Sequence, residues 1–103
     1  DTKIILAATI TPHSVTFGNG SHFNFTSLEK IEKTSTIKLY LQNLVNFATS
    51  QNFILADTYN PSLTNNQGNS SFISSSDHIH PSSLGAEFFS DTIASTIFQN
   101  KVL

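Results

Sequence analysis

The residues best suited to chemistry lie in one short segment, Asp77-His78-Ile79-His80-Pro81. An aspartate three residues before a histidine can turn back and accept the proton of one imidazole nitrogen. That contact fixes the tautomer and leaves the other nitrogen available as a general base. Pro81 fixes the backbone after His80 and disfavours helical geometry at His80 itself. The segment therefore predicts two members, Asp77 and His80, of a Ser-His-Asp triad.

Two short apolar runs are expected to form the strands that carry this segment. Residues 3–10 and 53–58 are typical of strands buried on both faces of a parallel sheet. Polar segments at 11–25 and 60–76 follow the two runs and are predicted to be loops. Ligands bind at the carboxyl ends of the strands in open α/β sheets, so the Asp-His pair, which follows the second loop, falls in the right region for a site.

Two helices are expected to alternate with these strands. The first runs from about 27 to 50, begins with the capping-box residues Thr26 and Glu29, and has a weak point at 34–36. The second runs from about 83 to 99. Strand, helix and strand in this order predict a parallel, right-handed βαβ unit. Because two strands alone make a poor parallel sheet, the chain is predicted to be part of a larger α/β sheet.

The sequence resembles the C-terminal half of the SGNH (GDSL-type) hydrolases. These enzymes end with an Asp-x-x-His block, often followed by Pro and then Gly, ahead of a last amphipathic helix. Here that block runs from Asp77 through His80 and Pro81 to Gly85. The strands and helices before it also match, so the resemblance covers nearly all of the chain. It implies that residues 1–103 are the C-terminal segment of one flavodoxin-like, three-layer α/β/α domain with a parallel sheet.

The resemblance also implies a serine esterase or lipase-type enzyme that hydrolyses carboxylic esters without a metal or an organic cofactor. Asp77 and His80 would be its catalytic residues. The family's Gly-Asp-Ser block, which carries the nucleophile, is absent from these 103 residues, and so are the blocks that form the oxyanion hole. We therefore expect the main partner to be an N-terminal half that carries the serine, either as a separate chain or as a removed segment. The other partner would be a small ester substrate.

Three other interpretations of the same residues stay open. His78 and His80 are alternate residues of an extended segment, so together with Asp77 they could bind a metal ion, although no fourth ligand has a useful spacing. The chain could instead be a non-catalytic α/β interaction module. It could also be an acyltransferase, since an acyl-enzyme can pass its acyl group to an alcohol other than water. The serines at 74–76 suit a flexible loop better than a replacement nucleophile.

The remaining candidate residues have simpler interpretations. Asp57, at the end of the second strand, is expected to cap the following turn, and His13 and His22 are expected to be exposed loop residues. Three phenylalanines of the first loop could line an acyl pocket, although a role as core and loop anchors explains them better: Phe17, Phe23 and Phe25.

The composition bears on partners and location. The formal net charge is −2, only 12% of residues are charged, and no basic stripe or basic amphipathic helix is visible, so neither nucleic acid nor a membrane surface is expected as a partner. No apolar run approaches the roughly 18 residues of a transmembrane segment. The chain begins at Asp1 rather than Met, which suggests a boundary with an upstream segment. A surface rich in Asn, Ser and Thr, with sequons at Asn19, Asn24 and Asn69, favours an extracellular (secreted) or periplasmic location.

Overall fold

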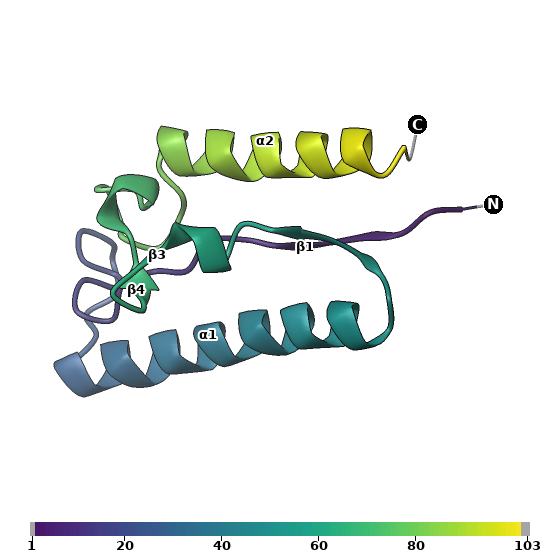
Figure 1. The fold of residues 1–103 in the computed structure, drawn as a ribbon. Coiled ribbons are helices and arrows are strands. Elements are labelled where there is room, and N and C mark those ends of the chain that lie inside the picture. Colours follow the sequence, from purple (N-terminus) through teal and green to yellow (C-terminus); the bar gives the residue numbers. More distant parts are fainter. Residues whose placement is uncertain (1, 102–103) are drawn as a thin grey trace.

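Two parallel strands form the centre of the structure, a computed structural model that describes residues 2–101. Strand β1 (Ile5–Ala8) pairs in parallel with β2 (Ile54–Asp57), and helix α1 (Ser27–Ser50) connects them. Helix α2 (Ser83–Gln99) follows. Figure 1 shows α1 on one side of the strand pair and α2 on the other. The chain is thus a small mixed α/β unit, as its pattern predicts, and the boundary expected at Asp1 lies outside the described residues.

The strands are shorter than the apolar runs that predict them, with four residues each. Their register runs from Ile5 opposite Ile54 to Ala8 opposite Asp57. Beyond this register the Thr58 N–H still donates to the Ala8 carbonyl at 2.9 Å, while the Asp57 carboxylate binds the turn that follows. Its Oδ1 accepts the backbone N–H of Asn60 at 3.0 Å, and its Oδ2 accepts the Asn60 side-chain amide at 2.7 Å. Asp57 therefore caps the turn after β2, as its position predicts.

Helix α1 begins and ends where the sequence places it. The Thr26 hydroxyl accepts the Glu29 backbone N–H at 3.1 Å, and the Glu29 carboxylate accepts the Thr26 N–H at 2.9 Å, which confirms the capping box. The expected weak point at 34–36 does not interrupt the helix. The Thr34 hydroxyl instead donates to the carbonyl of Lys30 at 2.8 Å, so its hydrogen bond is made within the helix.

Helix α2 is fixed at its first turn. The Ser82 hydroxyl accepts the Gly85 N–H at 3.1 Å and donates to the Ser71 carbonyl at 2.7 Å. One turn into the helix, the Phe88 ring packs against Phe72 with 5.0 Å between centroids. The start of α2 is thereby tied to the segment that precedes the Asp-His pair.

The segment at 60–76 is more ordered than predicted. Its centre is a short antiparallel hairpin whose two turn residues, Asn65 and Asn66, have φ angles of 51° and 61°. Positive φ at both central positions is typical of a type I′ turn, and asparagine accepts that geometry better than most residues. The prediction of an irregular loop was wrong over these elements: η1 (Asn60–Ser62), β3 (Leu63–Thr64), β4 (Gln67–Gly68) and η2 (Ser70–Phe72).

Much apolar surface faces solvent. The accessible surface is 6539 Å², against about 5,700 Å² for a typical monomer of this mass. The radius of gyration is 14.7 Å, where about 13 Å is typical of this length. Leu28 on α1 is 63% exposed and Phe98 on α2 is 84% exposed. Within the described part of the chain, β1 and β2 pair only with each other, so each has an open edge and the larger expected sheet is not present.

No helix in residues 2–101 has both the length and the apolar character to cross a bilayer.

Candidate active site

The Asp-His pair lies on a tight loop that backbone contacts close at both ends. Ile73 and Pro81 form an antiparallel bridge, and the Ser74 N–H donates to the His80 carbonyl at 2.8 Å. Inside the loop, the His78 N–H donates to the Ser74 carbonyl at 2.9 Å. In Figure 1 this loop lies with the 11–25 loop at the end of the molecule where β1 and β2 finish. The pair therefore lies at the carboxyl ends of the strands, the region its order along the chain predicts.

Asp77 accepts three hydrogen bonds from two residues, one from Ile79 and two from His80. Its Oδ1 accepts the backbone N–H of Ile79 at 2.9 Å and that of His80 at 3.1 Å. Its Oδ2 lies 2.5 Å from Nδ1 of His80. The hydrogen bond from the His80 ring, followed by those from the two backbone N–H groups, lowers the pKa of Asp77 to about 2. Asp77 is thus a carboxylate at neutral pH, held in one orientation.

This carboxylate determines the tautomer of His80. A carboxylate can only accept, so the proton of the Asp77–His80 contact belongs to Nδ1 of His80. In the neutral ring Nε2 then carries the lone pair, as a general base requires. The His80 side chain is 75% exposed, whereas that of Asp77 is 25% exposed. The basic nitrogen is therefore accessible to a group from outside the described chain.

Among the described residues, no serine hydroxyl hydrogen-bonds to the imidazole ring of His80, whose ring contact is with Asp77. The Ser74 hydroxyl, on the same loop, accepts the backbone N–H of Ser76 at 3.2 Å. The Ser74 hydroxyl therefore stabilises its own loop.

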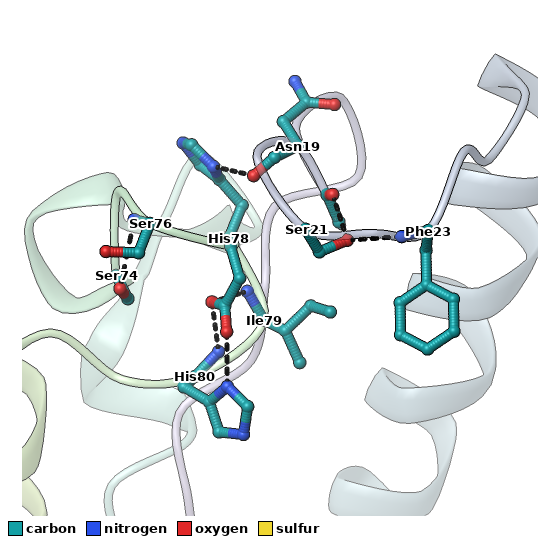
Figure 2. A network of polar contacts seen from close by, with 10 residues as sticks. Asn19, Ser21, Phe23, Ser74, Ser76, His78, Ile79 and His80 are labelled. Carbon is teal, nitrogen blue, oxygen red and sulfur yellow. Dashed lines mark hydrogen bonds and ion pairs between the residues drawn. The ribbon is translucent and has the colours of Figure 1, made fainter.

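His78 points away from the pair. Its Nδ1 lies 2.7 Å from the carbonyl oxygen of Asn19, a contact that Figure 2 shows on the other side of the loop from His80. The φ of His78 is 55°, which breaks the alternation of an extended segment. His78 and His80 therefore do not face the same way, and the metal-pair interpretation loses its geometric basis. Residues 2–101 bring together no set of three His, Asp or Glu side chains suited to a metal ion.

The 11–25 loop packs closely against the loop that carries Asp77 and His80. The sequence did not lead us to predict this contact. Gly20 has a φ of 86°, and a Cβ on it would collide with the carbonyl oxygen of Ser76. Next to it, the Ser21 hydroxyl donates to the Gly18 carbonyl at 2.6 Å and accepts the Phe23 N–H at 3.1 Å. Figure 2 shows this turn beside the loop of the Asp-His pair. The run Gly-Asn-Gly at 18–20 was the available signal for such a close approach.

The phenylalanines of the first loop stack on one another. The rings of Phe17 and Phe25 are 5.5 Å apart, those of Phe23 and Phe25 are 5.2 Å apart, and Phe17 is buried at 7% exposure. This stacking packs the loop on itself, with Phe17 at its buried end and Phe23 49% exposed. His22 is exposed and packs on Phe23, whereas His13 is half-buried, unlike the exposed residue that was expected.

No protein-family model, curated protein or solved structure matches this chain. Its function is therefore inferred from the site itself.

Proposed function

We propose that this chain supplies the histidine and aspartate of a Ser-His-Asp ester hydrolase of the SGNH (GDSL-type) family. The observation that carries the proposal is the contact between Asp77 Oδ2 and His80 Nδ1, which leaves Nε2 of an exposed imidazole available as a base. The helices on opposite sides of a parallel strand pair suit one end of a flavodoxin-like, three-layer α/β/α domain.

The chemistry follows from the orientation of His80. Its Nε2 takes the proton of the serine hydroxyl while the serine oxygen bonds to the ester carbonyl carbon. Asp77 stabilises the imidazolium that forms. The bond to the alcohol then breaks, and His80 gives its proton to the departing oxygen. In the second half, His80 takes a proton from water as that water attacks the acyl-enzyme, and the serine oxygen regains the proton when the acid leaves.

The serine and the oxyanion-hole donors would come from another segment, the N-terminal half of the enzyme. Three features support such a partner: the open edges of β1 and β2, the excess accessible surface, and the exposure of the His80 ring. An additional parallel strand on this pair would extend the sheet and cover apolar side chains. The site would then be complete only in the assembled protein.

The exposed, uncharged loops also support an extracellular or periplasmic location, which we propose with the enzyme class. Asn24 of the sequon in the first loop is solvent-exposed and accessible to modification. Treatment of the natively produced chain with a glycosidase would lower its mass if that sequon is used.

The test is to purify the chain from its native source and to treat it with a fluorophosphonate that labels activated serines. We expect a second polypeptide with a Gly-Asp-Ser block to copurify and to take the label. Labelling should disappear when His80 is changed to Ala. A monomeric chain of 103 residues with no second polypeptide and no label would contradict the proposal and favour a non-catalytic interaction module.

A further inference from the structure

A cavity of about 490 Å³ lies beside the loop of the Asp-His pair and is not lined by Asp77 or His80. Three segments form it: residues 13–16, residues 64–70 around the hairpin turn, and His78. Its volume falls within the range of about 300–1,000 Å³ that is usual for small-molecule sites. Figure 2 shows the His78 ring, which lines this cavity, turned away from His80, which does not line it.

The lining of this cavity is uncharged. It contains no Asp, Glu or Lys, and its hydrogen-bonding side chains are two imidazoles, three amides and three hydroxyls. Without Lys or Arg the lining has no permanent cation to pair with an anion, and without Asp or Glu it has no carboxylate to pair with a cation. The ligand that suits it is neutral and rich in hydrogen-bonding groups.

Internal hydrogen bonds orient several of these side chains and leave part of each unused. Gln67 Oε1 accepts the Ser14 backbone N–H at 3.2 Å, which fixes the side chain, and its amide NH₂ makes no hydrogen bond within the described residues. His13 Nδ1 accepts the Val15 N–H at 3.1 Å, so its Nε2 carries the proton. The lining therefore has donors that are fixed before a ligand arrives, which reduces the entropy lost on binding.

His78 offers the complementary group. Its Nδ1 must donate to the Asn19 carbonyl, because a carbonyl oxygen only accepts, so Nε2 of the neutral ring is an acceptor. The cavity thus combines an imidazole donor on His13 with an imidazole acceptor on His78. The lone pair of the His13 ring is on Nδ1, where it already accepts the Val15 N–H, and the described residues bring together no group of three metal-ligating side chains.

We propose that this cavity binds a neutral carbohydrate. A sugar hydroxyl both donates and accepts, which matches a lining that presents fixed donors and acceptors and no charge. Its C–H groups suit the apolar surface of Val15 and the methyl groups of Thr16 and Thr64. Binding of the sugar is independent of ester hydrolysis. Only the further step, that the sugar is the alcohol part of the ester, rests on the proposed function.

The test is calorimetric titration of the chain, together with any polypeptide that copurifies, with xylobiose, cellobiose and diacetylchitobiose. Asn65→Gly removes one lining amide and keeps the turn, because glycine accepts the φ of 51°. Asn66→Gly is the matched control, since Asn66 is in the same turn and does not line the cavity. Gln67→Glu keeps the acceptor for the Ser14 N–H but replaces the NH₂ donor with a charged oxygen.

We expect at least one disaccharide to bind, with about 2- to 10-fold weaker affinity in Asn65→Gly and in Gln67→Glu and unchanged affinity in Asn66→Gly. Binding of no probe at millimolar concentration would overturn the proposal, as would equal losses in Asn65→Gly and Asn66→Gly. Sugar binding without esterase activity would leave this inference standing and contradict the proposed function alone. Esterase activity without sugar binding would leave the proposed function standing and contradict this inference alone.

Discussion

Oδ2 of Asp77 lies 2.5 Å from Nδ1 of His80, while Oδ1 of the same carboxylate accepts two backbone N–H groups from the loop. The carboxylate therefore orients the imidazole and is itself oriented by the backbone. A carboxylate with this many donors stays ionised far below neutral pH, and it stabilises the positive charge that His80 would gain during catalysis. The following predictions depend on this contact and on the loops around it.

Asp77→Asn in the complete enzyme should keep the fold and misplace the imidazole proton. The amide can donate to Nδ1, which favours the tautomer with the proton on Nε2, where the base is needed. The analogous change in a serine protease lowers turnover by about 10⁴-fold. A smaller loss is expected if backbone carbonyls share in orienting His80. The measurement is kcat with a short-chain ester, with circular dichroism as the control for folding, and full activity would remove Asp77 from the mechanism.

His80→Ala should abolish most turnover, whereas His78→Ala should cost about tenfold through loop packing. Loss of a general base costs about 10²–10⁴-fold, and triad members act as a unit, so losses approaching 10⁶-fold are in range. His78 contacts Asn19 and not Asp77, so its removal leaves the pair intact. Ester hydrolysis is measured for both variants with and without EDTA. Equal losses together with inactivation of the wild type by EDTA would show that a metal site, rather than a triad, is present.

Gly20→Ala should displace the loop of the Asp-His pair. The new Cβ would collide with the Ser76 carbonyl, and alanine at a φ of 86° costs about 1–2 kcal/mol in a left-handed conformation. Gly18→Ala is the control, because Gly18 also has a positive φ but its Cβ would meet the Phe25 ring instead. Both variants should lower the free energy of unfolding. Only Gly20→Ala should also lower kcat and shift the NMR resonances of the His80 ring, and identical effects in both would refute this positioning role.

The pH dependence of stability should reflect the pKa of Asp77, which is lowered from 3.8 to about 2. A carboxylate whose pKa is lower in the folded state stabilises that state above its unfolded value. The contribution of Asp77 should therefore be present at pH 5 and be lost as the pH falls from about 4 to about 2. NMR titration of the Asp77 carboxyl carbon measures its pKa in the folded protein directly. In His80→Ala the pKa should rise towards 3.8, because the largest lowering contact is gone, and an unchanged value would contradict that cause.

The chain made alone should be poorly folded or should associate. Its helices expose large apolar side chains, and the parallel strand pair has open edges in the part of the chain that the structure describes. Analytical ultracentrifugation and thermal melting of the isolated 103-residue chain test this. A cooperative melting transition of a monomer would contradict it.

The sequence predicted the elements whose signals are local. The capping box at Thr26 and Glu29 placed the start of α1, and the three-residue spacing of Asp77 and His80 predicted their contact. What it did not predict depends on backbone angles or on residues far apart in the chain. Asn65 and Asn66 resemble any polar loop until both adopt positive φ. The contact between Gly20 and Ser76 joins segments that no sequence period relates. The function, the larger sheet and the serine-bearing partner remain predictions.

The three donors to Asp77 all lie within three residues of it in the sequence. Forming these contacts therefore closes only a very short loop and costs little conformational entropy. The geometry of the pair is thus encoded by a stretch of a few amino acids, whereas its location depends on tertiary links such as that between His78 and Asn19, 59 positions apart. Mutations in distant residues that hold this loop, such as Asn19, can therefore change the position or orientation of the Asp77–His80 pair during evolution. The hydrogen bonds within the pair need not change, because they are all local.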